Sequence, residues 1–186
     1  MITKLKFYLG LFHKPLNLGL LVAAYLLVAV VILPNVIQSI EELAGQKVEI
    51  LDLQIFGYST ERAFEILDRY GEPGRKVYQA AELSADIVYP FIYSILFSSI
   101  LFFFVKKINL LEKPFGKVIF LPFLTLALDW IENVFIVSIL INYDSHPTNL
   151  VTIASIFTLL KWSSIGLILL SFLGLLGCLI FKKTVV

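Results

Sequence analysis

The sequence has few charged residues and almost no cysteine. Among 186 residues 16% are charged, where a soluble domain has about a quarter, and the mean hydropathy is +0.89. The single cysteine, Cys178, excludes a disulfide framework, a CxxC redox pair and a thiolate metal site. The two histidines, His13 and His146, fall at opposite ends of the predicted helix bundle, so we expect no metal. This composition excludes an ordinary soluble domain and predicts a protein that crosses a membrane several times.

The sequence also lacks the motifs of the commonest enzyme classes. It contains no P-loop, GxGxxG, HExxH or GxSxG motif and no internal repeat. The basic residues form no nucleic-acid patch, and the net charge is only +1. We therefore expect no cofactor and no nucleic-acid partner. Whether the protein is an enzyme is left open by the sequence.

What the chain does contain is four long apolar runs. A helix rises about 1.5 Å per residue, so about 20 apolar residues cross the hydrocarbon core of a bilayer. The fourth run has 32 residues with Lys161 as its only charge, so it must tilt, bend or extend beyond the bilayer. We predict a single all-α membrane domain, 1–186: an antiparallel bundle of four transmembrane helices with a small helical or extended outer segment. The predicted spans are about 16–40, 86–105, 118–141 and 150–181, and the outer segment is about 41–85.

The N-terminal residues 1–15 mix lysines with apolar side chains, which predicts a short interfacial amphipathic segment. A cleaved signal peptide is the alternative interpretation of the first apolar run. We prefer a membrane span, because the run is longer than the core of a signal peptide and has no clear A-x-A cleavage site.

The lysines predict the orientation, because loops on the cytoplasmic side are enriched in Lys and Arg. The loop 142–149 contains Asp144 and no Lys or Arg, as an outer loop should. We therefore predict a protein of the cell (inner) membrane with both termini in the cytoplasm. Nine of the fifteen basic residues lie where this topology places the cytoplasm: Lys4, Lys6, Lys14, Lys106, Lys107, Lys113, Lys117, Lys182 and Lys183.

The outer segment contains two kinds of local pattern. Residues 47–56, KVEILDLQIF, are rich in β-compatible side chains and predict a short strand or an extended wall. Ser59 is a suitable N-cap for a helix, and Gly71 can close that helix in a left-handed conformation. A second helix should begin near Gly74 and continue without interruption into the second apolar run.

Acids inside the third run are the strongest sign of a site. Asp129, Glu132 and Asn133 are spaced i, i+3 and i+4 and therefore share one helix face. A charge in the bilayer costs about 2.5–3.5 kcal/mol on insertion scales, so such residues are usually paired and often functional. Lys161 in the fourth run is the available partner. Counting residues from the cytoplasmic lysines places this cluster in the outer half of the bundle.

A second polar strip is predicted at the start of the second run. Asp86, Tyr89 and Tyr93 fall on one helix face. Pro90 cannot donate a backbone hydrogen bond, and the carbonyl that it frees is accommodated more easily at a cavity than in lipid. Together with Trp162, which follows the lysine, the predicted ligand-binding residues are Asp86, Tyr89, Tyr93, Asp129, Glu132, Asn133, Lys161 and Trp162.

A structural interpretation is open for each of these residues. Lys161 can extend its ammonium to the outer interface, Trp162 can belong to an aromatic belt, and Asp86 can be an ordinary helix-end acid. Asp129 and Glu132 can form a buried pair, or can be protonated acids that hydrogen-bond between helices. The arginines of the outer segment can pair with nearby acids at the surface or form an anion clamp above the cavity. They are Arg62, Arg69 and Arg75.

Four strings together resemble a family of small bacterial membrane proteins with four predicted spans and no characterised activity: FGYSTERAFEILDRYGEPGR, ADIVYPFIY, LDWIEN and TLLKW. The resemblance covers most of the chain and implies the four-span layout, but no function. The layout also resembles claudin-like tetraspan proteins, which have one long outer segment after the first helix. This chain lacks the paired cysteines and the Trp motif of that group, so this second likeness concerns architecture alone.

Two functions fit these observations. The first is an integral membrane binding or interaction protein whose polar site holds a lipid or a small amphipathic ligand. The second is a membrane enzyme acting on a lipid or isoprenoid head group, with Glu132 or Asp129 as general acid or base and Lys161 stabilising anionic charge. We prefer the first, because the sequence supplies no cofactor motif and no nucleophile–base pair. A proton or ion path is a weaker third hypothesis. The expected partners are the bilayer and such a ligand, and an oligomer is compatible with the sequence.

Overall fold

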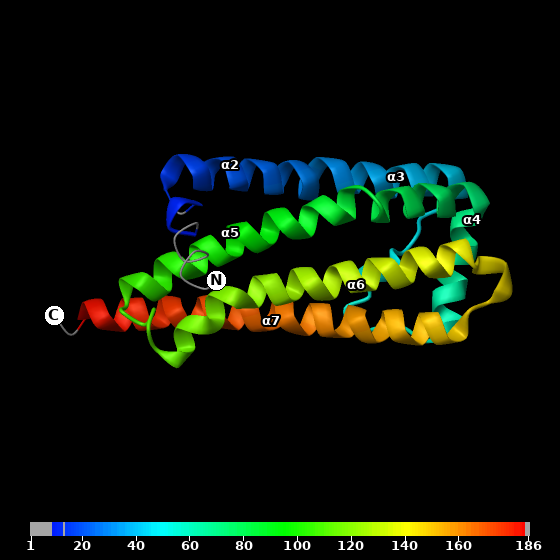
Figure 1. Ribbon diagram of the computed structural model, residues 1–186. Coiled ribbons are helices and arrows are strands. Elements are labelled where there is room, and N and C mark those ends of the chain that lie inside the picture. The colour runs from blue at the N-terminus through cyan, green and yellow to red at the C-terminus, as the bar shows by residue number, and fades with distance from the viewer. Residues whose placement is uncertain (1–8, 13, 185–186) are drawn as a thin grey trace. The chain divides into compact units, whose positions relative to one another are not determined.

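The computed structural model describes residues 9–12 and 14–184, with side chains up to Phe181, and it is all-helical in this part of the chain (Figure 1). Four helical stretches there are long and apolar enough to cross a membrane: Pro15–Ala44, Thr60–Lys107, Pro114–Ile141 and Thr148–Phe181. They pack together as a four-helix bundle, which confirms the predicted fold class. The amphipathic segment predicted for 1–15 lies largely outside the described residues.

The described residues divide into two compact units. The first unit takes its residues from 1–25, 91–126 and 163–186, and the second unit consists of 26–90 and 127–162. Three long helices contribute to both units: α5 (Ala85–Lys107), α6 (Leu121–Ile141) and α7 (Thr148–Thr184). That the whole chain is one membrane domain stays a prediction.

The first span changes its helical geometry midway. It consists of α2 (Pro15–Leu26), the π-helix η1 (Leu27–Ile32) and α3 (Leu33–Ala44). Pro34 lacks a backbone N–H, and its ring would collide with the carbonyl four residues earlier, so a normal α-helical turn cannot continue there. The wider turn relieves this conflict, as the bond from Leu33 N–H to the Val28 carbonyl shows. Only 6% of the span's most apolar stretch is buried inside the protein, as expected for a helix that faces lipid.

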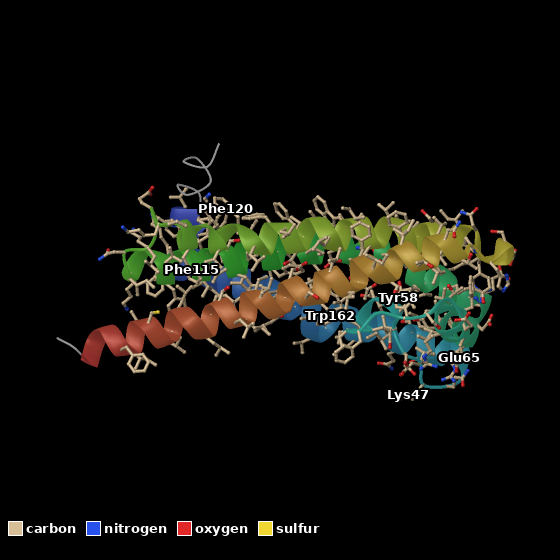
Figure 2. All side chains as sticks on the ribbon, turned by 90° about the horizontal axis from the view of Figure 1, so that it is seen from below. Lys47, Tyr58, Glu65, Phe115, Phe120 and Trp162 are labelled. Carbon is tan, nitrogen blue, oxygen red and sulfur yellow. The ribbon has the colours of Figure 1, made fainter. Side chains whose placement is uncertain are left out.

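The core of the first unit is apolar. Leu101, Phe102 and Val105 of α5 pack with Ile119 of the 3₁₀ segment η3 (Pro114–Phe120) and Leu175 of α7. Figure 2 labels Phe115 and Phe120, which also belong to η3. This 3₁₀ segment begins the third span and leads into α6.

The core of the second unit is built around α4 (Thr60–Glu82). Ser59 caps this helix as predicted, since its hydroxyl accepts the Arg62 N–H at 3.2 Å. Gly71 interrupts the helix with φ 64° and ψ 172°, so its φ is positive as predicted although its ψ is extended. Beyond this kink α4 lies beside α3 (Figure 1). Gly74 permits the close approach, because a side chain there would meet Ile40 of α3 at 3.3 Å.

Of two local predictions for the outer segment, one holds only in its extended alternative and the other is wrong. The described residues 47–56 form no strand, but the chain is extended around Ile50 and then makes one 3₁₀ turn, η2 (Leu51–Leu53). The helix that follows Gly74 does not continue into the second span, because Leu83 and Ser84 form a turn between α4 and α5. This turn places the end of α4 and the first turn of α5 next to each other in the second unit.

Candidate functional site

Lys161 of α7 lies at the centre of a buried group of acids in the second unit. Its side chain is turned inward, with 5% of the residue exposed, so of the two alternatives left open for Lys161 the structure has the buried pairing and not the extension to an interface. Its ammonium Nζ lies 2.6 Å from Glu132 Oε2, 3.9 Å from Asp52 Oδ2 and 4.0 Å from Asp129 Oδ1. We call Lys161, Glu132, Asp129 and Asp52 the acid–lysine cluster. Three carboxylates therefore surround one ammonium.

Glu132 of α6 is fully buried, and both of its oxygens have partners. Lys161 pairs with Oε2 at 2.6 Å, and the Thr158 hydroxyl donates to Oε1 at 2.5 Å. Thr158 lies less than one turn before Lys161 on α7, so one helix supplies both contacts. The geometry therefore agrees with the interpretation of Glu132 as a buried, paired acid. Asp129 lies beside the Glu132–Lys161 pair, and 8% of this residue is exposed.

Asp52 was missed by the analysis of the sequence. It lies in the 3₁₀ turn η2, within the loop before α4, and three contacts hold this loop against α4 and α7. The Tyr78 hydroxyl donates to Asp52 Oδ1 at 2.8 Å, the Trp162 indole N–H donates to the Asp52 carbonyl at 3.0 Å, and the Tyr58 N–H donates to Ser155 Oγ at 2.8 Å. The available signal was an acid within an otherwise apolar string, LDLQIF.

Tyr58 and Trp162 show how the loop is secured to α7 (Figure 2). Trp162 uses its indole N–H inside the protein, although the sequence also allowed it a place in an aromatic belt. Burial raises the pKa of the Tyr58 phenol, so this side chain stays neutral well above physiological pH. The loop thus adds the Asp52 carboxylate to the cluster and places the buried Tyr58 phenol close to it.

Asn133 resolves the problem that Pro90 creates. In a regular helix the residue at position 90 would donate to the Asp86 carbonyl, and proline cannot do so. The Asn133 amide donates to that carbonyl at 2.8 Å instead, and the Trp130 indole N–H donates to the Ile87 carbonyl at 3.0 Å. These bonds join α6 to the first turn of α5.

The two predicted tyrosines of α5 fall in different units. Tyr89 is half-buried in the second unit, which also contains Asp86. Tyr93 is buried in the first unit, where its ring stacks on Phe97 at 6.0 Å between centroids. That both tyrosines and Asp86 serve one site stays a prediction.

Glu82, the last residue of α4, is a second acid whose importance the sequence analysis missed. It is 1% exposed, and neither carboxylate oxygen accepts a hydrogen bond from the part of the chain that the structure describes. The nearby Tyr78 hydroxyl has one proton, which it donates to Asp52. Helical periodicity alone could not predict that Glu82 is buried, because the turn at 83–84 determines the position of the end of α4.

The arginines of the outer segment have partners within the protein. Arg62 pairs with Glu49 and Glu65, and Arg69 pairs with Glu65 at 2.6 Å. The Arg75 guanidinium lies 3.8 Å from the centre of the Tyr143 ring. This arrangement agrees with pairing at the surface and offers little support for an anion clamp.

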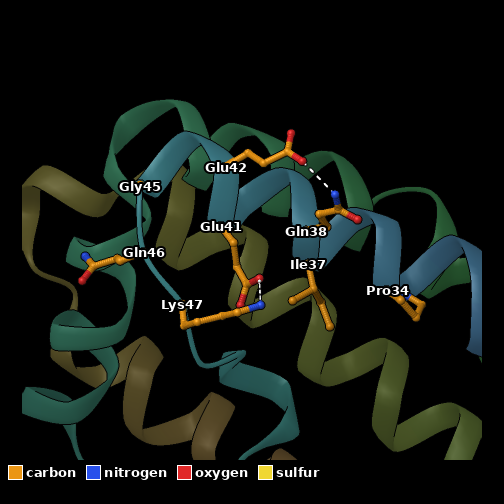
Figure 3. Close-up of a pocket in the computed structure, with 8 residues that line it drawn as sticks. All are labelled: Pro34, Ile37, Gln38, Glu41, Glu42, Gly45, Gln46 and Lys47. Carbon is orange, nitrogen blue, oxygen red and sulfur yellow. Dashed lines mark hydrogen bonds and ion pairs between the residues drawn. The ribbon is translucent and has the colours of Figure 1, made fainter.

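A pocket of about 740 Å³ lies at the end of α3 (Figure 3). Its polar side chains bind one another: Lys47 pairs with Glu41 at 2.7 Å, and the Gln38 amide donates to Glu42 at 2.8 Å. These polar groups already have partners, and the pocket is open to solvent. A ligand would therefore gain little from binding in this pocket.

Neither a protein-family model, nor a curated protein, nor a solved structure matches this chain. The resemblance to small four-span bacterial membrane proteins is therefore supported only at the level of the four apolar helices. Any functional conclusion has to come from the acid–lysine cluster and its surroundings.

Proposed function

We propose that this protein is an integral membrane binding protein whose second unit holds a lipid or a small amphipathic ligand. The observation that carries the proposal is the excess of acid at Lys161. One carboxylate satisfies a buried ammonium, yet Glu132, Asp129 and Asp52 all lie within 4.0 Å of it. Extra buried charges cost free energy, so retaining them favours a role beyond holding helices together.

Binding is favoured over catalysis by the burial of Glu132. A general acid or base must reach the proton that it transfers. Glu132 is fully buried, and both of its oxygens are occupied by Lys161 and Thr158. In this arrangement the Lys161–Glu132 ion pair sets the local electrostatic potential. A ligand contacts the less buried acids of the cluster, Asp129 and Asp52.

Native mass spectrometry of the purified protein tests this function. We expect the wild type to retain a lipid or small molecule, and Glu132→Gln to lose it while remaining folded, because Gln keeps the shape but changes the charge balance. Glu72→Gln is the control, since this acid pairs with Lys76 at the surface. Equal occupancy in wild type and Glu132→Gln, or no ligand in either, contradicts the proposal.

For the location we propose the cell (inner) membrane with both termini in the cytoplasm, on the basis of the lysine distribution. Gln46 is an exposed position for a probe of the outer segment, whereas Gly74 is packed against Ile40. In a Cys178→Ser background, Gln46→Cys should react with an impermeant maleimide on intact cells, and Lys113→Cys should react only after permeabilisation. The reverse pattern contradicts this topology.

A further inference from the structure

A groove of about 430 Å³ opens on the second unit between α6 and the junction of α4 with α5. Its volume is within the range of small-molecule sites, about 300–1,000 Å³. Leu83, Ile87 and Val134 line it, with 54%, 44% and 64% of each residue exposed. These residues belong to candidate membrane spans, so the walls suit an apolar body.

The walls of the groove are fixed by hydrogen bonds. Trp130 and Asn133, which also line it, are the two residues of α6 that donate to the Ile87 and Asp86 carbonyls. The groove therefore exists between helices that are already joined. Binding of a ligand in the groove therefore involves no loss of conformational entropy for ordering these helices.

Glu82 also lines this groove and is its one acidic residue. The residue is 1% exposed, and none of the described residues donates a hydrogen bond to either carboxylate oxygen. A buried ionised carboxylate without a donor is unfavourable, so this group requires a cation, a donor or a proton. A ligand in the groove can supply the first two.

The surrounding charges favour a cation over a neutral donor. The carboxylates of Asp52 and Asp86 add negative charge near Glu82, and Lys161 is the basic group that opposes them there. The ammonium of Lys161 already pairs with Glu132 at 2.6 Å. The region next to Glu82 is thus left with more acid than base.

The lining distinguishes an organic cation from a metal ion. Ca²⁺ and Mg²⁺ require about six oxygen ligands, whereas this groove combines one carboxylate and the Asn133 amide with apolar side chains. An alkylammonium group needs only a few acceptors for its N–H donors and carries an apolar chain that the walls can cover.

We propose that this groove binds a single-chain amphipathic amine, with its ammonium at Glu82 and its chain along Leu83, Ile87 and Val134. The inference rests on the proposed binding function, for which it names the ligand class. On binding, the Glu82 side chain turns from its buried position toward the groove and its carboxylate accepts from the ammonium. The chain displaces the lipid that would otherwise contact these walls.

Quenching of Trp130 fluorescence by a brominated ligand tests the inference. In detergent, ω-bromododecylamine should quench saturably, and the matched ω-bromododecanol should quench at least about tenfold more weakly, because it lacks the charge that pairs with Glu82. Trp130→Phe should remove the saturable component, which assigns it to this groove. Equal quenching by amine and alcohol in the wild type would overturn the proposal.

Two variants test the position of the ammonium. Glu82→Gln should reduce the affinity for the amine to that for the alcohol, and Glu61→Gln, an acid at the exposed start of α4, should leave both unchanged. Should Glu82→Gln fail to fold, Ser138→Leu narrows the groove from α6 without altering the acid and should abolish saturable quenching. Unchanged amine binding in folded Glu82→Gln, or in Ser138→Leu, would refute the assignment.

The two proposals can fail separately. Loss of a co-purifying ligand in Glu132→Gln together with equal amine and alcohol quenching would retain the binding function and reject the amine. Preferential amine quenching together with equal ligand occupancy in wild type and Glu132→Gln would support the groove and reject the acid–lysine cluster as the basis of binding.

Discussion

The two units bury polar groups of different kinds. Among the residues that the structure describes, the buried polar groups of the first unit are hydroxyls, and those of the second unit include ionisable side chains. A hydroxyl can bond a carbonyl of its own helix, as Ser94 does with Phe91 at 2.9 Å, and needs no particular neighbour. A charge cannot be satisfied in this way, so Lys161 and Glu132 need partners from other elements. Charged positions therefore specify which helices meet, and hydroxyl positions do so only weakly.

Among the substitutions that test this difference between the two units, we expect the largest effect at Lys161. Lys161→Met leaves Glu132, Asp129 and Asp52 without their cation, and we expect it to destabilise the protein by about 3–5 kcal/mol. Thermal unfolding in detergent, followed by helical circular dichroism, measures the loss. Adding Glu132→Gln should restore part of the stability, because the innermost uncompensated charge is then removed.

Lys76→Met is the matched control. Lys76 pairs with Glu72 at 2.7 Å, but both side chains are exposed, so we expect little change. Strictly additive losses from Lys161→Met and Glu132→Gln would argue against direct coupling within the acid–lysine cluster.

A smaller effect is expected at Thr158, whose hydroxyl donates to the Glu132 carboxylate at 2.5 Å. Thr158→Val keeps the shape of the side chain but removes this donor, leaving a buried carboxylate oxygen without it. Hydrogen bonds to charged groups contribute about 1.5–3 kcal/mol, and we expect a destabilisation of that size in the same unfolding measurement. If Thr158→Val destabilises the protein no more than Thr125→Val does in the first unit, Glu132 is not charged.

The sequence predicts the helical architecture well, since apolar runs long enough to span a bilayer allow few other folds. It also predicts that Glu132 and Lys161 are unusual, because charges in such runs are rare. It does not predict which way Lys161 turns. A long flexible side chain can reach an interface or an acid, and the choice depends on what the neighbouring helices present.

Asp52 and Glu82 show what the sequence conceals. The string 47–56 has the composition of a strand, yet its course is set by distant partners, Trp162 and Tyr78. Glu82 sits at the end of a helix that was expected to continue, and the turn at 83–84 decides where its carboxylate lies. Both residues are positioned by tertiary contacts, and local periodicity carries no information about these.

Thr125 of the first unit is the neutral counterpart of Thr158, and the stability losses of the two Thr→Val variants can be compared. Both threonines are fully buried, and each hydroxyl oxygen also lies within hydrogen-bond distance of the carbonyl four residues earlier, but the tertiary partner of Thr125 is the Ser164 hydroxyl at 2.8 Å. Bonds between neutral groups in membrane proteins contribute about 0.6 kcal/mol on average. Thr125→Val should therefore cost about 0.5–1 kcal/mol, clearly less than Thr158→Val. Equal costs would show that the two units bury polar groups of similar strength.

The smallest effect is expected at Tyr143, which extends the charged character of the second unit to the loop between α6 and α7. Its hydroxyl donates to the Asp68 carboxylate. Burial, and after it the hydrogen bond and charge of Asp68, raise the pKa of Tyr143 from an ordinary value of 10.0 to about 12. Below about pH 10 the phenol is neutral in both folded and unfolded chains, and the stabilisation is fully present.

Between about pH 10 and pH 12 the unfolded chain loses this proton first, so Tyr143 favours unfolding increasingly as the pH rises. Tyr143→Phe removes the titration, and its stability should fall less steeply than that of the wild type over this interval. At neutral pH the variant should differ only by the loss of one partly exposed hydrogen bond. Melting temperatures of both proteins across the interval measure the difference. Parallel curves would mean that Tyr143 ionises equally easily in the folded and unfolded chains, and that the influence of Asp68 does not extend to this loop.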